Sequence, residues 1–432
     1  MSDVSRRNFL ATTGTVVATT TLAQRSATAD VNSKIRAAVL GVNGRGRTHI
    51  DQLSIQEGVE VAVLCDPDQR VAGAQAENIE RAYGHKVEIE SDMRNVFDRD
   101  DIDVVTVATP NHWHSLATIW ACQAGKDVYV EKPGSHNIYE GRKMVEAAKK
   151  YKRVVQHGVQ LRSSTAIQEA VEHLRKGTIG EVYMARGLVF RWRPTIGKKM
   201  PTDIPQGFDW NLWQGPAEDR EYSPRYVHYN WHWHWDYGNG DVGNQGIHET
   251  DMCLWGLDVG LPSQVTAMGG KFLWDDDKET PEVLTSCYHY PEEKKMIQFE
   301  VRHWCTNDEK DTRVGNIFYG SEGILVVNGY GSYSIYLGKN NDPGPSRSEG
   351  GVVQRHFVNF IQAVRERRPE IQNGPVETAH LSSGLAHLGN IAYRLGRQLQ
   401  FDPQTETFVG DPEADRLLTR NYRAPFVVPE VV

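Results

Sequence analysis

The sequence predicts an α/β protein with two domains. The first is a doubly wound parallel sheet of the Rossmann type, and the second is an α+β domain with an open-faced, mainly antiparallel sheet. A length of 432 residues favours two domains over one. Up to about residue 156, short apolar strands alternate with helical patterns. Beyond residue 160, strands follow one another without helices long enough for parallel crossovers. We expect residues 30–160 to form the first domain and residues 161–432 the second.

The composition argues against several classes of protein. The formal net charge is -8, and no basic block is long enough to indicate nucleic-acid binding. The five cysteines are odd in number and include no CxxC pair, which argues against a structural zinc site or a dense disulfide framework. We therefore predict no bound metal and no nucleic-acid partner.

Residues 1–29 are expected to be a twin-arginine signal peptide. Ser5–Leu10 contains Arg6 and Arg7, a mildly apolar run follows, and Ala27-Thr28-Ala29 offers a small-x-small cleavage site. The alternative is a tail with two chance arginines. The export interpretation implies the twin-arginine translocase as a partner and a periplasmic or otherwise exported protein.

A glycine loop and an acidic residue follow the first two predicted strands. Ile35 to Leu40 runs into Gly41-Val42-Asn43-Gly44-Arg45-Gly46, a GxGxxG pattern with Asn43 in place of the second glycine, before a helix near Arg47. Such glycines let a pyrophosphate approach the backbone at a helix N-terminus. The strand Val59 to Leu64 precedes Asp66, which can bond a ribose 2′-hydroxyl and so favours NAD over NADP. Arg70 makes that preference moderate.

A second site is predicted where the strand Val128 to Val130 ends in Glu131-Lys132-Pro133-Gly134. The carboxyl ends of strands are where ligands bind in open α/β sheets, and a lysine there can stabilise an oxygen that loses its proton. The alternative is a surface ion pair at a turn. The other elements predicted for this domain are a strand over 104–108, helices over 115–123 and 137–151, a short helix within 87–101 and a strand over 153–156.

The second domain is predicted to contain a helix over 165–176 and six strands. The strands are expected over 181–192, 264–273, 283–290, 296–304, 314–319 and 324–327. Residues 338–351 are rich in Gly, Pro and Ser, which predicts a mobile loop. Two helices close the chain, one with its apolar face from Val353 to Val364 and the other from Leu385 to Leu399.

These residues resemble the Gfo/Idh/MocA family of sugar oxidoreductases, which includes glucose–fructose oxidoreductase and inositol dehydrogenase. The matching pieces, in the family's order, are the glycine loop, Cys65-Asp66, Ala108 to His114, Ala124-Gly125-Lys126, Glu131-Lys132-Pro133, Gly158-Val159-Gln160, Lys176 to Glu181 and Gly246 to Asp251. The resemblance implies a tightly bound nicotinamide cofactor, NAD rather than NADP. It also implies a homo-oligomer, a dimer or tetramer formed through the open sheet.

The resemblance also assigns site residues. The expected cofactor-binding residues are Gly41, Asn43, Gly44, Arg45, Gly46, Asp66, Thr109, Asn111, His114, Glu131, Lys132 and Gln160. Lys132 and His248 match the family's catalytic lysine and histidine. Asn244 stands where the family often has an aspartate four residues before that histidine; it can contact substrate but carries no charge. Asp241 or Asp251 could supply the missing charge.

The segment from Tyr226 to Asp241 is unusually aromatic. If it is extended, three tryptophans that include Trp231 and Trp233 share one face, and His232 and His234 share the other. It would then form the lip of a sugar pocket, or alternatively an aromatic strand packed between the domains. Metal binding by the two histidines is a further alternative, but no third ligand is evident. The predicted substrate-binding residues are Arg162, Trp231, His232, Trp233, His234, Asn244 and His248.

Together these features predict an exported NAD-dependent oxidoreductase that acts on a secondary hydroxyl of a sugar or glycoside. His248 would be the general base, and Lys132 would stabilise the developing alkoxide. One alternative is a hydrolase or lyase that oxidises its substrate transiently and returns the hydride. The other is a non-catalytic sugar-binding or scaffold protein.

Overall fold

The first sheet has six strands in the order β3-β2-β1-β4-β5-β6, and every neighbouring pair is parallel. In this computed structural model, residues 34–200 and 202–432 are described. The predicted signal residues therefore lie outside the described part. The strands are β1 (Ile35–Leu40), β2 (Val59–Cys65), β3 (Glu88–Glu90), β4 (Val104–Val107), β5 (Asp127–Val130) and β6 (Val155–His157). This confirms the predicted Rossmann sheet.

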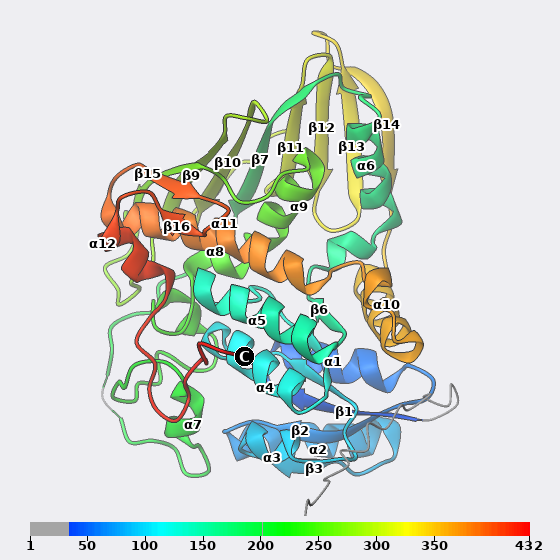
Figure 1. The fold of residues 1–432 in the computed structure, drawn as a ribbon, viewed down its shortest axis with the longest axis vertical. Helices are drawn as coiled ribbons and strands as arrows, with labels where there is room; N and C mark the ends of the chain where they lie inside the picture. Colours follow the sequence, from blue (N-terminus) through cyan, green and yellow to red (C-terminus); the bar gives the residue numbers. More distant parts are fainter. Residues whose placement is uncertain (1–33, 201) are drawn as a thin grey trace, which may run out of the picture. The chain divides into compact units, whose positions relative to one another are not determined.

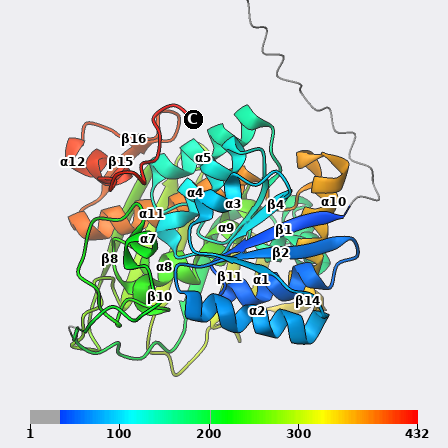
Figure 2. The same ribbon diagram turned by 90° about the horizontal axis from the view of Figure 1, so that it is seen from below.

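Helices cover both faces of this sheet, as Figure 2 shows. On one side lie α1 (Arg45–Ser54) and α2 (Gln69–Tyr83); on the other lie α3 (Met93–Phe97), α4 (Asn111–Gln123) and α5 (Ile138–Tyr151). The strands are buried almost throughout because both faces are covered. Helix α5 begins as predicted, since the Asn137 side chain accepts a hydrogen bond from the Glu140 amide at 2.9 Å.

Helix α4 begins at Asn111, four residues earlier than the predicted start at Ser115. Pro110 precedes it with a φ of −58°, which suits a helix start. The amide of His112 donates to the distant Tyr237 oxygen at 3.3 Å, a contact that no local pattern reveals.

The second sheet has ten strands in the order β14-β13-β12-β11-β7-β10-β9-β8-β15-β16. Only β7 and β10 pair in parallel, so the sheet is mainly antiparallel, as predicted. Its strands are β7 (Val182–Phe190), β8 (Gln264–Gly270), β9 (Val283–Tyr290), β10 (Lys295–Arg302), β11 (Val314–Gly320), β12 (Gly323–Asn328), β13 (Ser332–Leu337), β14 (Asp342–Ser348), β15 (Leu399–Asp402) and β16 (Thr407–Phe408).

Two predictions for the strands and helices around this sheet were wrong. Residues 342–348, predicted as a mobile loop, form the edge strand β14, paired with β13. Its side chains are almost all exposed, so it lacks the alternation that marks a half-buried strand. Leu399 does not continue the last long helix but lies in β15, because Gly396 ends that helix in the left-handed region with a φ of 65°.

The longer of the remaining helices pack on one sheet or the other, and one of them contacts helices of both halves. Helices α9 (Ile247–Leu257) and α11 (Val376–Leu395) pack against the second sheet, and α11 also contacts α5 (Figure 1). Helix α10 (Val352–Glu366) packs on the first sheet instead, where Phe357 stacks on Tyr129 at 4.3 Å. The other short helices are η1 (Gln160–Ser163), α6 (Thr165–Arg175), α7 (Trp210–Gln214), η2 (Asn230–Trp233), α8 (Gly240–Asn244), η3 (Pro369–Ile371), α12 (Pro412–Asp415) and η4 (Arg416–Leu418). No helix within the described ranges is both long and apolar enough to traverse a bilayer.

Candidate active site

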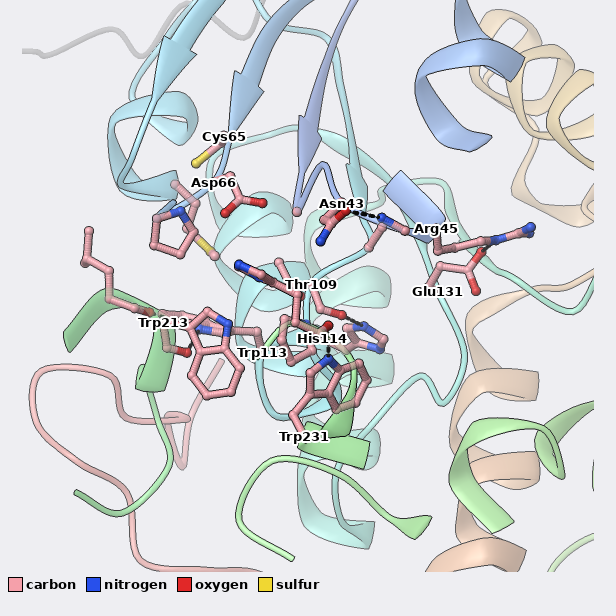
Figure 3. A pocket seen from close by; sticks show the side chains of 18 of the residues that line it. Asn43, Arg45, Cys65, Asp66, Thr109, Trp113, His114, Glu131, Trp213 and Trp231 are labelled. Atoms are coloured by element: carbon pink, nitrogen blue, oxygen red, sulfur yellow. Dashed lines mark hydrogen bonds and ion pairs between the residues drawn. The ribbon is translucent and has the colours of Figure 1, made fainter. Parts of the chain in front are cut away.

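A cavity of about 390 Å³ lies at the carboxyl edge of the first sheet (Figure 3). The first-domain residues that line it and were predicted as site residues are Gly41, Asn43, Gly44, Arg45, Asp66, Thr109, His114, Glu131 and Lys132. From the second half it brings together Trp231, His232 and Asn244. The other predicted residues, Gly46, Asn111, Gln160, Arg162, Trp233, His234 and His248, do not line it.

Gly41 and Gly46 of the glycine loop lie too close to other backbone atoms to carry a side chain. A Cβ on Gly41 would lie 2.7 Å from the Thr109 nitrogen, and its φ of +78° is one that favours glycine. A Cβ on Gly46 would lie 2.0 Å from the Gly41 oxygen. Asn43, in place of the second glycine, accepts a hydrogen bond from the Gly44 amide at 2.9 Å. The loop runs straight into α1, so it fits a dinucleotide whose pyrophosphate meets a helix N-terminus.

Asp66 lies at the end of β2 and faces the same cavity. Its carboxylate accepts hydrogen bonds from the backbone amides of Val42, at 3.0 Å, and Asp68, at 2.9 Å. Burial raises the Asp66 pKa despite these two bonds. Arg70 pairs with Asp68 at 2.6 Å. The nearby arginine is thus bound to another acid, and Asp66 fits a ribose hydroxyl better than a 2′-phosphate.

Glu131 and Lys132 follow β5 and carry opposite charges. Glu131 is buried and accepts from Arg45 Nε at 2.6 Å, and the His49 ring lies 3.1 Å from the same oxygen. Burial alone would raise the Glu131 pKa, but Arg45 and His49 outweigh it and hold the pKa well below its usual range. Lys132 Nζ donates to the Asn244 backbone oxygen at 2.6 Å and lies 3.5 Å from its side-chain oxygen. Burial lowers the Lys132 pKa, and Glu131 opposes that shift.

The residues expected along the nicotinamide ribose lie at different depths. The two ring nitrogens of His114 lie 2.6 Å from the Pro133 oxygen and 2.8 Å from the Thr109 oxygen, and burial lowers its pKa. Asn111 and Gln160 are buried and do not line the cavity. Within the described ranges, both polar side-chain atoms of Asn111 and the Gln160 Oε1 lack hydrogen-bond partners.

His248 is buried in the first turn of α9, and its ring centroid lies 5.0 Å from that of Tyr330. Its Nδ1 has no hydrogen-bond partner in the described part of the chain. Burial, followed by the positive charge of Lys132, holds the His248 pKa well below its usual range. Lys132 and His248 therefore act on each other electrostatically, but only Lys132 lines the cavity.

The two aspartates that could have replaced the missing charge beside His248 are bound elsewhere. Asp241 accepts from Arg193 at 2.8 and 2.7 Å and from Asn244 Nδ2 at 3.3 Å. Burial opposes ionisation of Asp241, but His303 and Arg193 outweigh it and lower the pKa. Asp251 accepts from Arg162 at 2.8 and 3.0 Å. This pair also explains why Arg162, a predicted substrate-binding residue, does not line the cavity.

The aromatic segment is not extended, so the predicted alternation of its faces was wrong. Residues 230–233 form the 3-10 helix η2, and the Trp231 ring stacks on His232 at 3.6 Å. Both of these side chains line the cavity, and burial lowers the His232 pKa to about 3. Trp233 and His234 are each 2% exposed, Trp233 beside His303 and His234 beside Glu279. No group of three or more His, Cys, Asp or Glu side chains within residues 34–200 and 202–432 is placed to hold a metal.

Sequence reasoning predicted Trp231 and His232 but missed the rest of the second wall of the cavity. Residues 204–233, which we call the covering segment, cross the end of β2: the Asp209 amide donates to the Pro67 oxygen at 2.9 Å, and the Gln69 amide donates to the Gly207 oxygen at 2.9 Å. The additional lining residues are Cys65, Pro67, Ser91, Asp92, Met93, Ala108, Pro110, Trp113, Leu212, Trp213, His228 and Tyr229. The only available signal was the density of tryptophan and tyrosine in this stretch.

Comparisons with known proteins agree with this architecture. The family model described as "Oxidoreductase family, NAD-binding Rossmann fold" matches residues 35–159. The model described as "Oxidoreductase family, C-terminal alpha/beta domain" of the same family, GFO_IDH_MocA, matches residues 166–275 and 351–428.

Curated relatives match a shorter stretch. They include "Alpha-N-acetylgalactosaminidase" of Shewanella oneidensis and "Glycosyl hydrolase family 109 protein 1" of Shewanella sp. (strain ANA-3). Each is 28% identical over 174 residues, which is 35% of this chain and 38% of the relative. The match thus spans well under half the length of these relatives.

Solved structures share the fold across most of the chain. The WlbA dehydrogenase from Bordetella pertussis, in complex with NADH and UDP-GlcNAcA, has a TM-score of 0.65 at 19% identity and covers 85% of this chain and 99% of its own. Aldose-aldose oxidoreductase from Caulobacter crescentus, complexed with glycerol, has a TM-score of 0.62 at 18% identity and covers 85% of this chain and 100% of its own.

Proposed function

Because this chain belongs to the Gfo/Idh/MocA family of oxidoreductases and carries its NAD-binding Rossmann domain, we propose that it transfers hydride between a secondary hydroxyl of a sugar or glycoside and NAD. The observation that carries the proposal is the contact of Lys132 Nζ with Asn244, which joins the two halves of the molecule at one cavity. A Rossmann domain alone would not indicate a substrate site.

The residues present fit an oxidised dinucleotide. The glycine loop would bind the pyrophosphate, Asp66 the adenosine ribose, and Thr109 and His114 the nicotinamide ribose. When bound, the nicotinamide ring supplies the acceptor for the hydride, which no amino-acid side chain can provide. Trp231 would offer a ring face to the apolar side of a sugar.

Lys132 would hold the reacting oxygen. An ammonium has three donor hydrogens, and its two Asn244 contacts leave one for a substrate hydroxyl. As that hydroxyl loses its proton, the positive charge stabilises the alkoxide in a site shielded from water. His248, matched by motif and coupled to Lys132 by charge, is the proposed general base.

The test is Lys132→Ala. We expect hydride transfer in single-turnover assays to fall by about two orders of magnitude or more, while dinucleotide binding stays within about threefold. Lys176→Ala, at an exposed position on the surface, is the control and should change neither quantity. Unchanged hydride transfer in Lys132→Ala would remove Lys132 from the mechanism.

A second candidate is a redox-neutral glycosidase, which oxidises the sugar, eliminates the leaving group, adds water and returns the hydride. Two observations favour it: the curated relatives named above are glycosidases, and Asn244 is uncharged where an aspartate is common. Measurement of net NADH separates the candidates, because a redox-neutral enzyme releases aglycone without accumulating NADH.

We also propose that the protein is exported by the twin-arginine route and forms a homo-oligomer. The support is the Arg6-Arg7 pattern in the sequence and the exposed Tyr183 and Met268 on strands of the second sheet. Replacing both arginines with lysine should retain the protein in the cytoplasm, as cell fractionation would show. Light scattering of the purified protein would give the oligomer size.

A further inference from the structure

Tyr229 is a cavity residue that neither the motifs nor the comparisons assign. It immediately precedes η2, lines the cavity and is 51% exposed. Its phenol oxygen accepts one hydrogen bond from Arg193 Nη1 at 2.9 Å and another from Asn244 Nδ2 at 3.3 Å. The phenol oxygen is therefore held from two sides by donors.

These two contacts leave the phenol hydrogen unused. A phenol has one O–H donor and accepts through its lone pairs, whereas a guanidinium and an amide NH₂ can only donate. No acceptor for the Tyr229 O–H lies within hydrogen-bond distance in the described part of the chain. The hydrogen is thus free to bond an oxygen of a ligand in the cavity.

The partners of Tyr229 are themselves fixed. Arg193 is bound by both oxygens of Asp241 and lies over the Trp233 ring at 5.6 Å. Asn244 faces Lys132 with its carbonyl oxygen and Tyr229 with its NH₂ group. The Asn244 amide therefore contacts both Lys132, which would hold the substrate oxygen, and the phenol. A negative charge on the phenol oxygen would be stabilised by two hydrogen-bond donors, Asn244 and the cationic Arg193.

We propose that Tyr229 is a catalytic residue that exchanges a proton with the reacting hydroxyl. This rests on the proposed function. In the reductive direction, the phenol O–H bond breaks and a new O–H bond forms on the substrate oxygen as the carbonyl carbon gains the hydride. The resulting phenolate is held by Arg193 and Asn244. In the oxidative direction the phenolate takes that proton back, and the C–H electron pair leaves as hydride to the oxidised dinucleotide.

The position of Tyr229 distinguishes it from His248. The histidine is buried and does not line the cavity, so a substrate proton can reach it only by way of another group. The phenol is half exposed and can pass the proton on to water. Tyr229 is accordingly the group proposed to contact the reacting hydroxyl directly, and His248 keeps its role as general base only for a proton that another group passes to it.

The experiment compares Tyr229→Phe with Tyr222→Phe, a control in the same segment that does not line the cavity. For Tyr229→Phe we expect kcat to fall about 100-fold with KM within about threefold, and the solvent deuterium isotope effect on kcat to change. Dinucleotide binding, followed by quenching of tryptophan fluorescence, should match the parent protein. Tyr222→Phe should resemble the parent protein in every assay.

The outcomes separate the two proposals. An active parent protein with unchanged kcat in Tyr229→Phe would overturn the role of Tyr229 and leave the proposed function intact. Weakened dinucleotide binding in proportion to the lost kcat would also overturn it, since it would reveal a structural role. A parent protein that forms neither NADH nor aglycone from any sugar tested would overturn the proposed function, and the role of Tyr229 with it.

Discussion

The floor of the cavity and the covering segment are stabilised by different interactions. The floor, which consists of the glycine loop, Asp66 and Glu131-Lys132, is attached to the ends of β1, β2 and β5 and is shaped by backbone. The covering segment has only the short helices α7 and η2 and is held by rings. Trp210 stacks on Trp213 at 4.8 Å, and its ring nitrogen donates to the Arg220 oxygen at 2.8 Å.

This difference shows what each wall can tolerate. A floor built from strand ends allows few residue types at its turns, because φ angles and backbone clearances are fixed there. A wall built from packed rings depends on many contacts that are individually weak. We therefore expect a single substitution in the floor to cause a large loss of dinucleotide binding. A single substitution in the covering segment should cause a smaller change.

Gly41→Ala is the sharpest test of the floor. The added Cβ would lie 2.7 Å from the Thr109 nitrogen, at a φ that already strains alanine, so the loop must move away from the pyrophosphate site. We expect NAD affinity, measured by calorimetry, to fall on the order of 100-fold. Gly84→Ala is the matched control, because its φ of +75° is similar but its Cβ would meet nothing within 4 Å. Equal losses in both variants would show that the effect of Gly41→Ala does not come from the missing clearance beside Thr109.

Two buried glutamates extend the comparison. In the floor, Arg45 and His49 hold the Glu131 pKa low, so the stability gained from this residue is lost as pH falls. In α9, burial raises the Glu249 pKa from 4.5 to about 8, and its contact with Gln245 does not offset this. The unfolded chain releases that proton first, so Glu249 should lower stability as pH rises from 4.5 to 8.

Glu249→Gln should remove this pH dependence. At about pH 9 we expect the variant to be more stable than the parent protein by up to about 5 kcal/mol in urea unfolding, with little difference in the acid range. Glu172→Gln, at an exposed position on α6, should leave the profile unchanged. A variant whose stability falls in parallel with the parent protein across this range would show that Glu249 is ionised at low cost.

Phe208→Ala probes the covering segment where it crosses β2. Phe208 is 6% exposed, forms a bridge with Asp68, and packs against Trp210 and Tyr222. Removal of the ring should loosen the crossing and speed dinucleotide dissociation about tenfold in stopped-flow measurements. Phe272→Ala, at a residue that is 71% exposed, is the control. An unchanged dissociation rate would mean that the segment does not limit release.

The same difference between the floor and the covering segment explains which parts of the structure could be predicted from the sequence. Strand periodicity and glycine spacing are local, so the Rossmann sheet and the mainly antiparallel sheet could be predicted. The family resemblance assigned Lys132 and Asn244 to the site, but the contact between them is long-range and was not predicted. The covering segment could not, because its course depends on bonds such as that from the Asp209 amide to the Pro67 oxygen, between residues distant in sequence. Alternation assumed for Trp231 and Trp233 failed because η2 rotates successive side chains by about a third of a turn, not half. β14 was missed because an exposed edge strand has no apolar pattern.

The covering segment also has a consequence for turnover. Its backbone is bonded to Pro67 and Gln69, beside the place proposed for the adenosine, so we expect a bound nucleotide to leave slowly. We expect the hydride taken from one sugar to stay on the bound dinucleotide until it is transferred to a carbonyl compound. Given a single alcohol, the enzyme would then turn over only as fast as the reduced dinucleotide leaves. Given an alcohol and a suitable ketone or aldehyde together, it would cycle without any free coenzyme in the surrounding fluid.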